Sequence, residues 1–372
     1  MPDALTIAKR LLADMVIEDD FVVLALPEFR LEIRSNSQQL LDRLRRYFAH
    51  ATDEARTDVK ADVVVHAIEG PPVDLGLDFI HWQREPGKSG RKDAYHDLSD
   101  GRLIRKVRTG MLFLQSEGDR IARGPCVAND NQIINFVNCQ YMNWLQRRGA
   151  LICHASCVVF GEQGLAIAGF SGGGKSSLML RLLEEHGGQF LTNDRLLLGS
   201  TPDGEARAIG IPKLPRVNPG TILSLPSLRP MFDQPTRGKF ESLPTEELWT
   251  LEQKYDVDVT AVYGDDRIVF QSRLTDLLVL NWQRNSDSEC QIKQVNLRER
   301  PELLKAITKT PGPFYSDRNG VFQTDDLRDD HRPYLRRLEH VNVWEASGTL
   351  DFAFAAQRCL ERLRTDRCTK TS

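Results

Sequence analysis

Hydrophobic positions in the first part of the chain recur with the spacings of strands and of a few helices. In the segment 21–35, FVVLALPEFRLEIRS, apolar residues alternate with charged ones over the second half, which predicts a pair of strands or a hairpin. Ser37 is an N-cap candidate before leucines at helical spacing in 38–51, which predicts a helix. The same patterns predict three more strands and one more helix, at 61–68, 102–109, 110–116 and 131–150. Residues 1–148 are therefore expected to form an α+β domain.

In the second part of the chain, short apolar runs alternate with helical segments. The runs ALICHASCVVF (150–160) and GLAIAGF (164–170) are followed by a helical pattern and then by QFLTNDRLLLG (189–199). This order predicts an α/β layer sheet. The segment 220–255 contains several prolines and predicts an irregular flap over a site. We expect a second domain at 149–365.

Length and composition fit a globular protein and exclude several classes. The 372 residues exceed the ~150 residues of a typical domain, which agrees with two domains. No uncharged apolar run approaches the roughly 18 residues needed to cross a bilayer, and the start lacks the pattern of a secretory signal. The net charge of −3 argues against a dedicated nucleic-acid binder, and seven cysteines without a CxxC pair suit a reducing compartment. We therefore expect a cytoplasmic protein that binds neither membrane nor nucleic acid.

The segment 169–176 carries the most informative motif. It reads GFSGGGKS, a full match to GxxxxGK[ST], and lies between a predicted strand and a predicted helix, as a phosphate-binding loop requires. Its glycines let backbone N–H groups turn towards phosphate oxygens, Lys175 would meet the β and γ phosphates, and Ser176 would ligate Mg²⁺. The expected nucleotide-binding residues are Gly169, Ser171, Gly172, Gly173, Gly174, Lys175, Ser176 and Ser177. A glycine-rich helix cap that binds nothing is the alternative, but it has no need for both Lys175 and Ser176.

Phosphoryl transfer also needs a carboxylate near the γ-phosphate. Asp194 directly follows a predicted strand and is the candidate, either as a ligand of Mg²⁺ or as a proton acceptor; a turn or cap aspartate is the alternative. The apolar run 274–282, LTDLLVLNW, contains Asn281 where a conventional ATPase would carry an aspartate. ATP and Mg²⁺ are thus the expected cofactors, with Ser176 and Asp194 as the metal ligands.

The phosphate loop and the strand after it resemble the kinase domain of HPr kinase/phosphorylase. GFSGGGKSS, the helix behind it and FLTNDRLLL carry the resemblance, and they are still more similar to the relatives labelled HPr-kinase-related kinase B. The loop also resembles the GLSGTGKTT type of ATP-dependent phosphoenolpyruvate carboxykinases, whose nucleotide-binding fold the HPr kinases share. The resemblance is good over 150–220, extends to residue 360 in general layout, and does not reach the N-terminal domain. It implies an α/β fold in which an α+β N-terminal domain precedes a C-terminal P-loop domain. This C-terminal domain would be HPr-kinase-like and phosphoenolpyruvate-carboxykinase-like.

The resemblance also implies roles for individual residues. The family's histidine before the loop corresponds to His154, and its acidic pair corresponds to Asn193 and Asp194. The first acid, which the resemblance casts as the proton acceptor, is an amide here, and an amide cannot take a proton at neutral pH. Either Asp194 does both jobs, or another carboxylate such as Asp203 or Glu205 replaces the missing acid, or catalysis is lost. His154 is either a group near the γ-phosphate or acceptor, or a hydrogen-bonded core residue.

Lys175, Asp194 and His154 are accordingly the expected catalytic residues of an ATP-dependent kinase. We expect a serine-type phosphotransferase that moves the γ-phosphoryl group to a hydroxyl of a protein, a peptide or a small molecule. The N-terminal domain would recruit that acceptor, and the resemblance implies a homo-oligomer. An ATP-binding switch or sensor that transfers nothing is the alternative, and Asn193 favours it. A GTPase or transport ATPase is a third hypothesis, disfavoured because the sequence has no obvious NKxD motif.

Overall fold

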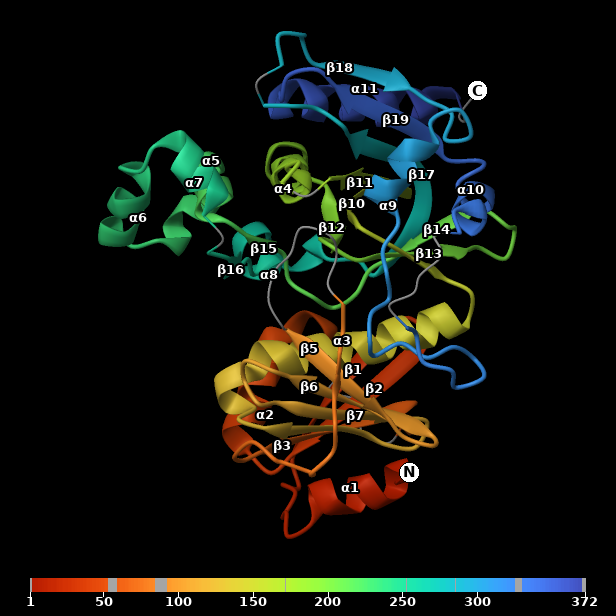
Figure 1. The fold of residues 1–372 in the computed structure, drawn as a ribbon. Coiled ribbons are helices and arrows are strands. Elements are labelled where there is room, and N and C mark those ends of the chain that lie inside the picture. Colours follow the sequence, from red (N-terminus) through yellow and green to blue (C-terminus); the bar gives the residue numbers. More distant parts are fainter. Residues whose placement is uncertain are drawn as a thin grey trace. The chain divides into compact units, whose positions relative to one another are not determined.

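The computed structural model describes residues 2–52, 59–83, 92–170, 172–251, 253–284, 286–324 and 330–369. The chain forms two compact units: Met1–Arg148 with Thr310–Asp329, and Gly149–Lys309 with Asp330–Ser372. Each unit combines helices with a large mixed β-sheet (Figure 1). The segment Thr310–Asp329 thus belongs to the first unit, although the sequence patterns placed it in the second domain.

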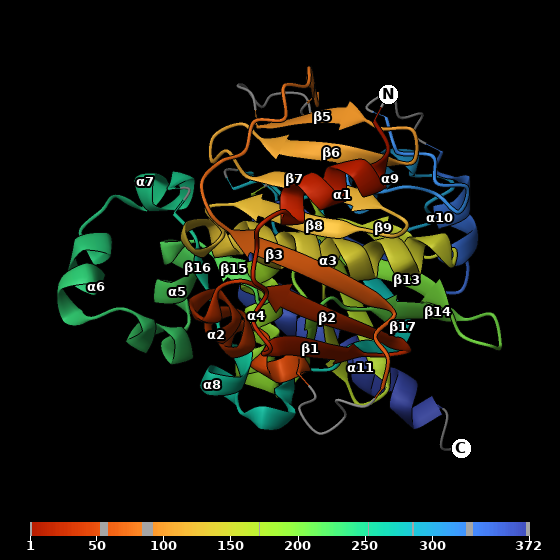
Figure 2. The ribbon, with the colours of Figure 1, turned by 90° about the horizontal axis from the view of Figure 1, so that it is seen from below.

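An eight-stranded sheet forms the centre of the first unit, in the order β1-β2-β3-β8-β7-β6-β5-β4. Strand β3 is parallel to its neighbours β2 and β8, and the other neighbouring pairs are antiparallel. The strands are β1 (Phe21–Leu26), β2 (Phe29–Ser35), β3 (Val63–Glu69), β4 (Ile80–His81), β5 (Asp93–Asp97), β6 (Gly101–Lys106), β7 (Leu112–Ser116) and β8 (Arg120–Gly124). Helix α1 (Ala4–Leu12) lies over β7 and β8 on one face (Figure 2), and helices α2 (Gln38–Tyr47) and α3 (Asp130–Arg147) cover the other face.

The hydrophobic pattern correctly predicted the beginning of this unit. β1 and β2 form the hairpin expected at 21–35, with Phe21 opposite Arg34. Helix α2 begins behind Ser37, whose hydroxyl oxygen accepts a hydrogen bond from the backbone N–H of Leu40 at 3.3 Å. The leucines of α2 that recur at helical spacing are fully buried, because they form the face that packs on the sheet.

One buried arginine ties the segment Thr310–Asp329 to the first unit. The side chain of Arg102 on β6 is 1% exposed, and its guanidinium donates hydrogen bonds to the carbonyls of Gln323 at 2.7 Å and Pro313 at 3.4 Å. The amide of Asn143 on α3 donates to the carbonyl of Phe314 at 2.7 Å. A buried charge is tolerated only when its hydrogen bonds are satisfied, so these carbonyls and Arg102 stabilise one another.

The second unit contains a nine-stranded sheet in which only part of the expected alternation of strand and helix is present. Its main path is β12-β10-β11-β17-β14-β13-β9, with β19 paired to β17 and β18 paired to β19. β10 and β11 pair antiparallel without a helix between them, whereas β11, β17 and β19 run parallel. The strands are β9 (Leu151–Cys153), β10 (Ala155–Phe160), β11 (Gln163–Gly169), β12 (Gln189–Thr192), β13 (Leu196–Ser200), β14 (Ala206–Ile209), β17 (Gln271–Leu280), β18 (Gln291–Gln294) and β19 (Asn342–Ser347).

Helices cover both faces of this second sheet. Helix α4 (Lys175–His186) packs against α11 (Phe352–Thr369), and together they bury one apolar face of the sheet. The short helices α9 (Leu304–Ile307) and α10 (Arg332–Arg337) contribute to the core on the other face. Single 3-10 turns complete the chain at η1 (Ala49–Ala51), η2 (Val127–Asn129), η4 (Asp265–Arg267) and η5 (Pro301–Leu303). The described helices include none that is long and apolar enough to cross a membrane.

The segment expected to be an irregular flap is largely helical, so the prediction of irregular structure was wrong. The segment and its flanks form α5 (Pro219–Ser224), η3 (Pro226–Met231), α6 (Gln234–Glu241), α7 (Thr245–Thr250) and α8 (Val259–Tyr263), with a two-stranded ladder of β15 (Arg216–Val217) and β16 (Tyr255–Asp256). Most of the prolines lie in the first turns of α5, η3 and α6 or, as with Pro244, at the N-cap of α7, and Pro230 lies inside the 3-10 helix η3. Proline fits the first turn of a helix because the N–H that it lacks has no partner there in any case.

Candidate functional site

The predicted phosphate loop joins the end of β11 to the start of α4. Gly174 is the N-cap residue of α4 and has a φ of +85°, and Gly172 has a φ of +78°. These left-handed conformations strongly favour glycine. The backbone N–H of Gly173 donates to the carbonyl of Phe170 at 3.0 Å, which closes the turn. Ser171 lies outside the described residues.

Two glycines of the loop are also required by close packing. A Cβ atom on Gly169 would lie 2.9 Å from the Cβ of Leu280, the residue opposite it on β17. A Cβ atom on Gly174 would lie 2.5 Å from the ring of Phe352 at the start of α11. Both distances are shorter than carbon atoms tolerate, so a larger residue would displace the loop or its support.

A pair of aromatic residues, Trp282 and Phe352, packs against the loop. Trp282, which follows β17, donates from its Nε1 to the carbonyl of Gly173 at 2.9 Å. Its ring meets the ring of Phe352 edge-on at 5.3 Å between centroids. Trp282 and Phe352 therefore hold the loop in place through one hydrogen bond and one close steric contact.

Lys175 is the first residue of α4 and is 9% exposed. Its Nζ donates to the carbonyl of Gly169 at 2.9 Å, so the side chain bridges the two ends of the loop. Burial lowers the pKa of Lys175 to about 8; the charge of Asp194 opposes this shift, and those of Lys309 and Lys254 add to it. Because burial disfavours its charged form, an ammonium group in this position is strongly stabilised by a nearby anion.

The two serines behind Lys175 differ in their surroundings. Both are half-buried in the first turn of α4. The hydroxyl of Ser177 lies 2.8 Å from the hydroxyl of Thr221 on α5, so this serine links the loop helix to the helical segment. Ser176 is the loop hydroxyl at the position that a phosphate-bound metal would contact.

The structure brings His154 and Asp194 together. His154 lies in the turn between β9 and β10, and Asp194 lies in the turn between β12 and β13. The Nε2 atom of His154 is 3.2 Å from Oδ1 of Asp194, and their side chains are 27% and 48% exposed. His154 is therefore neither a core histidine nor isolated, because its ring pairs with the predicted carboxylate.

The charge states of this pair follow from their neighbours. Partial burial alone would raise the pKa of Asp194, but the hydrogen bond with His154 and the charge of Lys309 hold it well below its usual range. The hydrogen bond to Asp194 raises the pKa of His154, yet burial and the charges of Lys309 and Lys175 outweigh it and leave a net lowering. At neutral pH the pair is thus an ionised carboxylate and a neutral imidazole, with Nε2 as the donor to Asp194 and Nδ1 as the unprotonated nitrogen.

Sequence reasoning missed two cations beside Asp194 and a third whose charge acts on Lys175. Arg195 Nε lies 3.9 Å and Lys309 Nζ lies 3.8 Å from Oδ2 of Asp194. Lys254, exposed before β16, acts on Lys175 through its charge. Arg195 follows Asp194 directly and could have been suspected, whereas Lys309 and Lys254 belong to segments with no motif.

The alternative carboxylates considered from the sequence do not join this group. Glu205 pairs with Arg273 at 2.6 Å, and Asp203 stands in the turn that joins β13 to β14. Asp194 precedes β13 while this turn follows it, and five strand residues separate the two ends by about 15 Å. The amide oxygen of Asn193 is buried and has no hydrogen-bond partner among the described residues.

Asn281 lies beside a carboxylate that is already engaged. β17 is the parallel neighbour of β11, and the side chain of Asn281 donates to Oε1 of Glu345 on β19 at 2.7 Å. Arg300 donates to both oxygens of Glu345, at 2.5 and 2.9 Å, and holds its pKa below the usual range against the effect of burial. The charge of Glu345 is thus balanced by that of Arg300, and Glu345 is a poor substitute for the aspartate that a conventional ATPase would carry at position 281.

The oxygen ligands of the candidate site fit a Mg²⁺ ion that is shared with nucleotide phosphates better than a metal ion held by protein side chains alone. The described part of the chain contains no group of three His, Cys, Asp or Glu side chains able to hold a metal ion. Ser176 and Asp194 offer two oxygen ligands of the hard type that Mg²⁺ prefers. Mg²⁺ commonly completes its shell with water and substrate phosphates, so this donor set fits a metal that arrives with a nucleotide.

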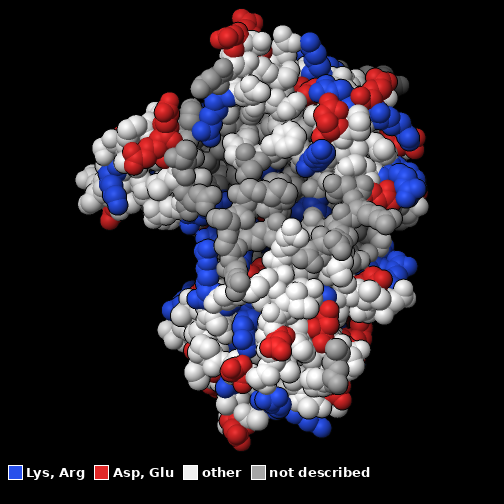
Figure 3. Space-filling model, in the orientation of Figure 1, with Lys and Arg blue, Asp and Glu red and all other residues white. Residues whose placement is uncertain are grey.

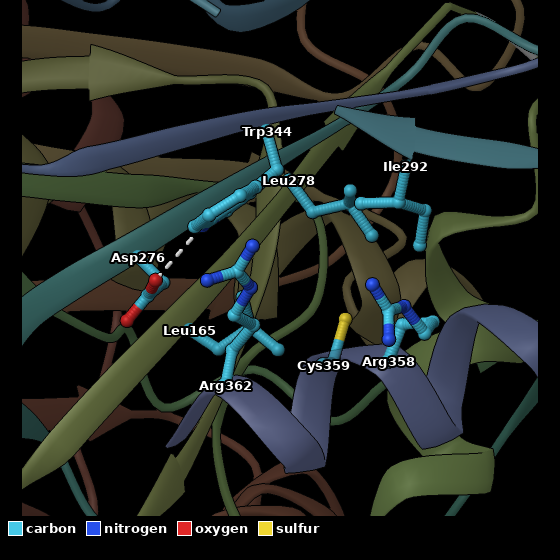
Figure 4. A pocket seen from close by; sticks show the side chains of 8 residues that line it. All are labelled: Leu165, Asp276, Leu278, Ile292, Trp344, Arg358, Cys359 and Arg362. Carbon is cyan, nitrogen blue, oxygen red and sulfur yellow. Dashed lines mark hydrogen bonds between the residues drawn. The ribbon is translucent and has the colours of Figure 1, made fainter. Parts of the chain in front are cut away.

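A small cavity elsewhere in the second unit is not a substrate site. It lies between β17, β19 and α11 and measures about 10 Å³, room for at most one water molecule (Figure 4). The Nε1 of Trp344 donates to Oδ1 of Asp276 at 2.9 Å, and the guanidinium of Arg362 lies 4.1 Å from the Trp344 ring. The first contact joins β19 to β17, and the second holds α11, which begins at Phe352, against the sheet.

Charged residues are interspersed on the face of the molecule in Figure 3. Lys and Arg side chains lie among Asp and Glu side chains there, without a broad region of one sign.

Comparison with known proteins found similarity among solved structures. No family model matches the sequence, and no curated protein matches it. The solved structure of the Hpr(Ser) kinase/phosphatase from Coxiella burnetii is similar to this chain with 13% sequence identity and a TM-score of 0.30. The match covers 59% of this chain and 99% of the other. A similarity of this size does not establish a shared activity.

Proposed function

We propose that the protein is an ATP-dependent kinase that transfers the γ-phosphoryl group to a hydroxyl. The observation that carries this proposal is the position of Lys175, buried at the start of α4 with its ammonium across the ends of the GFSGGGKS loop. A buried ammonium beside N–H groups of a helix N-terminus is an anion site. The pair of His154 and Asp194 lies near the charge of Lys175 and supplies a proton acceptor for the reacting hydroxyl.

The reaction follows from the groups at the loop. The acceptor oxygen forms a bond to the γ-phosphorus while the bond from phosphorus to the bridging oxygen breaks, and ADP leaves with that electron pair. Lys175 and the loop N–H groups stabilise the negative charge on the transferred group and on the leaving oxygen. Mg²⁺, held with Ser176 and Asp194, would supply further charge neutralisation at the phosphates.

The acceptor proton goes to the pair of His154 and Asp194. Asp194 is a weak proton acceptor, since its pKa is held well below the usual range despite its partial burial. Neutral His154 donates from Nε2 to Asp194 and keeps the lone pair of Nδ1 for a proton. Asp194 thereby orients the ring and stabilises the imidazolium, as a carboxylate does beside a general-base histidine.

Transfer of label from γ-labelled ATP tests the proposal. Purified protein is incubated with the ATP and with a cell lysate as the pool of acceptors, and Lys175→Ala serves as the matched variant. We expect labelled acceptors with the parent protein and none above background with Lys175→Ala. Equal labelling by both proteins, or no labelling by either, would contradict the proposal.

A nucleotide-binding switch without transfer is the second candidate, and Asn193 is the observation that favours it. Asn193 stands where the resemblance predicts a carboxylate, and its buried amide oxygen has no partner among the described residues. Asn193→Asp separates the two functions. A kinase that already uses His154 and Asp194 would change only modestly, whereas a switch that lacks an acid would gain label transfer from a background level.

A further inference from the structure

Three cations lie near the carboxylate of Asp194, namely Lys175, Arg195 and Lys309, and Lys254 adds its charge at Lys175. We call these four residues the cation group. Lys309 is the common neighbour, because its charge acts on Lys175, on His154 and on Asp194. The positive charge of the group exceeds the single negative charge of Asp194. A site with such an excess attracts anions and raises their local concentration.

The members of the cation group come from different segments of the second unit. Lys175 belongs to the phosphate loop through its bond to the carbonyl of Gly169. Lys309 reaches Asp194 from the segment behind α9, and Arg195 reaches it from the turn before β13. Both ion pairs are 3.8–3.9 Å long and involve Oδ2, whereas His154 meets Oδ1.

The position of Lys309 is fixed by backbone contacts beside His154. The N–H of His154 donates to the carbonyl of Ile307 at 2.7 Å, and Thr308 forms a bridge with Cys153 on β9. The N–H of Thr308 also donates to the carbonyl of Leu304 at 2.8 Å. The Lys309 side chain is only 16% exposed, so its ammonium has little freedom to move away from Oδ2 of Asp194.

We propose that the acceptor is an anionic alcohol, with a carboxylate or phosphate group close to the reacting hydroxyl, and that Lys309 binds this anionic group. The proposal rests on the proposed kinase function. The nucleotide phosphates occupy Lys175 and the loop, which leaves Lys309 and Arg195 to face the acceptor at the His154 and Asp194 pair. The ammonium group of Lys309 lies a few ångströms from the pair that takes the proton of the reacting hydroxyl. This arrangement favours a substrate that carries both an anionic group and an alcohol.

Matched acceptors distinguish the sources of such a ligand. The first set consists of one serine peptide flanked by Asp and Glu, by Asn and Gln, or by Lys and Arg. The second set compares glycerate with glycerol. Transfer from γ-labelled ATP is measured for each, and we expect kcat/KM to be about tenfold higher for the anionic member of at least one set.

Variants of Lys309 test the assignment. Lys309→Gln should remove the preference for the anionic probe, Lys309→Glu should favour the basic peptide, and Lys309→Arg should retain the preference. Lys305→Gln, an exposed lysine of α9, is the control and should behave as the parent. A thermal unfolding scan verifies that each variant is folded.

The possible failures can be told apart. Transfer to lysate acceptors with no preference for anionic probes, or a preference that survives in folded Lys309→Gln, would overturn the assignment and leave the kinase function standing. No transfer to any acceptor, lysate included, would overturn the kinase function and the acceptor class with it.

Discussion

The Nε2 atom of His154 lies 3.2 Å from Oδ1 of Asp194, although the two residues come from different turns of the second unit. The contact joins a neutral imidazole to an ionised carboxylate. Burial and nearby cations lower the pKa of His154, and the hydrogen bond with His154 and the charge of Lys309 outweigh burial and lower the pKa of Asp194. The pair gives the phosphate loop a group able to take a proton from an acceptor.

Replacement of Asp194 by Asn should separate transfer from nucleotide binding. The amide keeps the shape of the side chain but loses the charge that orients His154 and stabilises its protonated form. We expect the rate of label transfer to fall by about 10²- to 10⁴-fold. The affinity for ATP without metal, measured by titration calorimetry, should change by less than about threefold, because Lys175 and the loop N–H groups, which are proposed to bind the phosphates, are unchanged. Asp203→Asn, in the β13–β14 turn, should match the parent in both measurements.

The affinity for ATP should depend on pH through Lys175. The pKa of this lysine is lowered to about 8, so its ammonium is largely charged at neutral pH and loses its charge as pH rises through that value. Bound phosphates favour the charged form, and binding therefore weakens with rising pH. Between roughly pH 7 and pH 9 we expect about a tenfold loss of affinity in titration calorimetry. Lys175→Met should lack this dependence, and a parent affinity that is constant or rises over this range would contradict the role of Lys175.

Gly174→Ala should harm the loop more than Gly187→Ala, although both glycines flank α4 with left-handed backbones. A Cβ on Gly174 would lie 2.5 Å from Phe352, whereas nothing lies within 4 Å of a Cβ on Gly187. Both changes incur backbone strain of about 1–2 kcal/mol. Gly174→Ala should lose a further 1–3 kcal/mol or so of unfolding free energy in urea titrations. Combination with Phe352→Ala should recover part of that further loss, and equal stability of the two single variants would refute the steric account.

Arg102→Met should destabilise the first unit. The substitution removes the donors to the carbonyls of Pro313 and Gln323 and leaves Asp97 without its partner guanidinium. We expect a loss of about 3 kcal/mol of unfolding free energy and faster proteolytic cleavage within 310–324. Arg108→Met, an exposed arginine after β6, should change the free energy by less than about 0.5 kcal/mol.

Local signals predicted what local geometry determines. The hairpin at 21–35, helix α2 behind Ser37 and the strand–loop–helix around Lys175 each follow from spacing within a short segment. Prolines near 219–244 misled the prediction, since proline favours turns and first helical turns alike. The return of Thr310–Asp329 to the first unit depends on the distant Arg102, which no local pattern reveals.

In the candidate site, too, residues marked by a local pattern could be predicted, and residues placed by long-range contacts could not. Lys175 and Asp194 could be predicted because a motif and a strand end mark them. Lys309 could not, since its place beside Asp194 depends on the pairing of Thr308 with Cys153 on a strand far away in the sequence. Whether His154 lies in the core or at the site was likewise decided by the distant turn that carries Asp194.

Titration of ATP with Mg²⁺ into the purified protein is the measurement that tests the central claim most directly, since transfer and switching alike need a nucleotide at the GFSGGGKS loop. The parent should bind, and Lys175→Met should bind at least 30-fold more weakly, a loss of about 2 kcal/mol or more for a buried charge removed from a phosphate. Arg181→Met on the same helix should bind as the parent does. A parent protein that does not bind ATP, or a Lys175→Met variant that binds it equally well, would contradict the account.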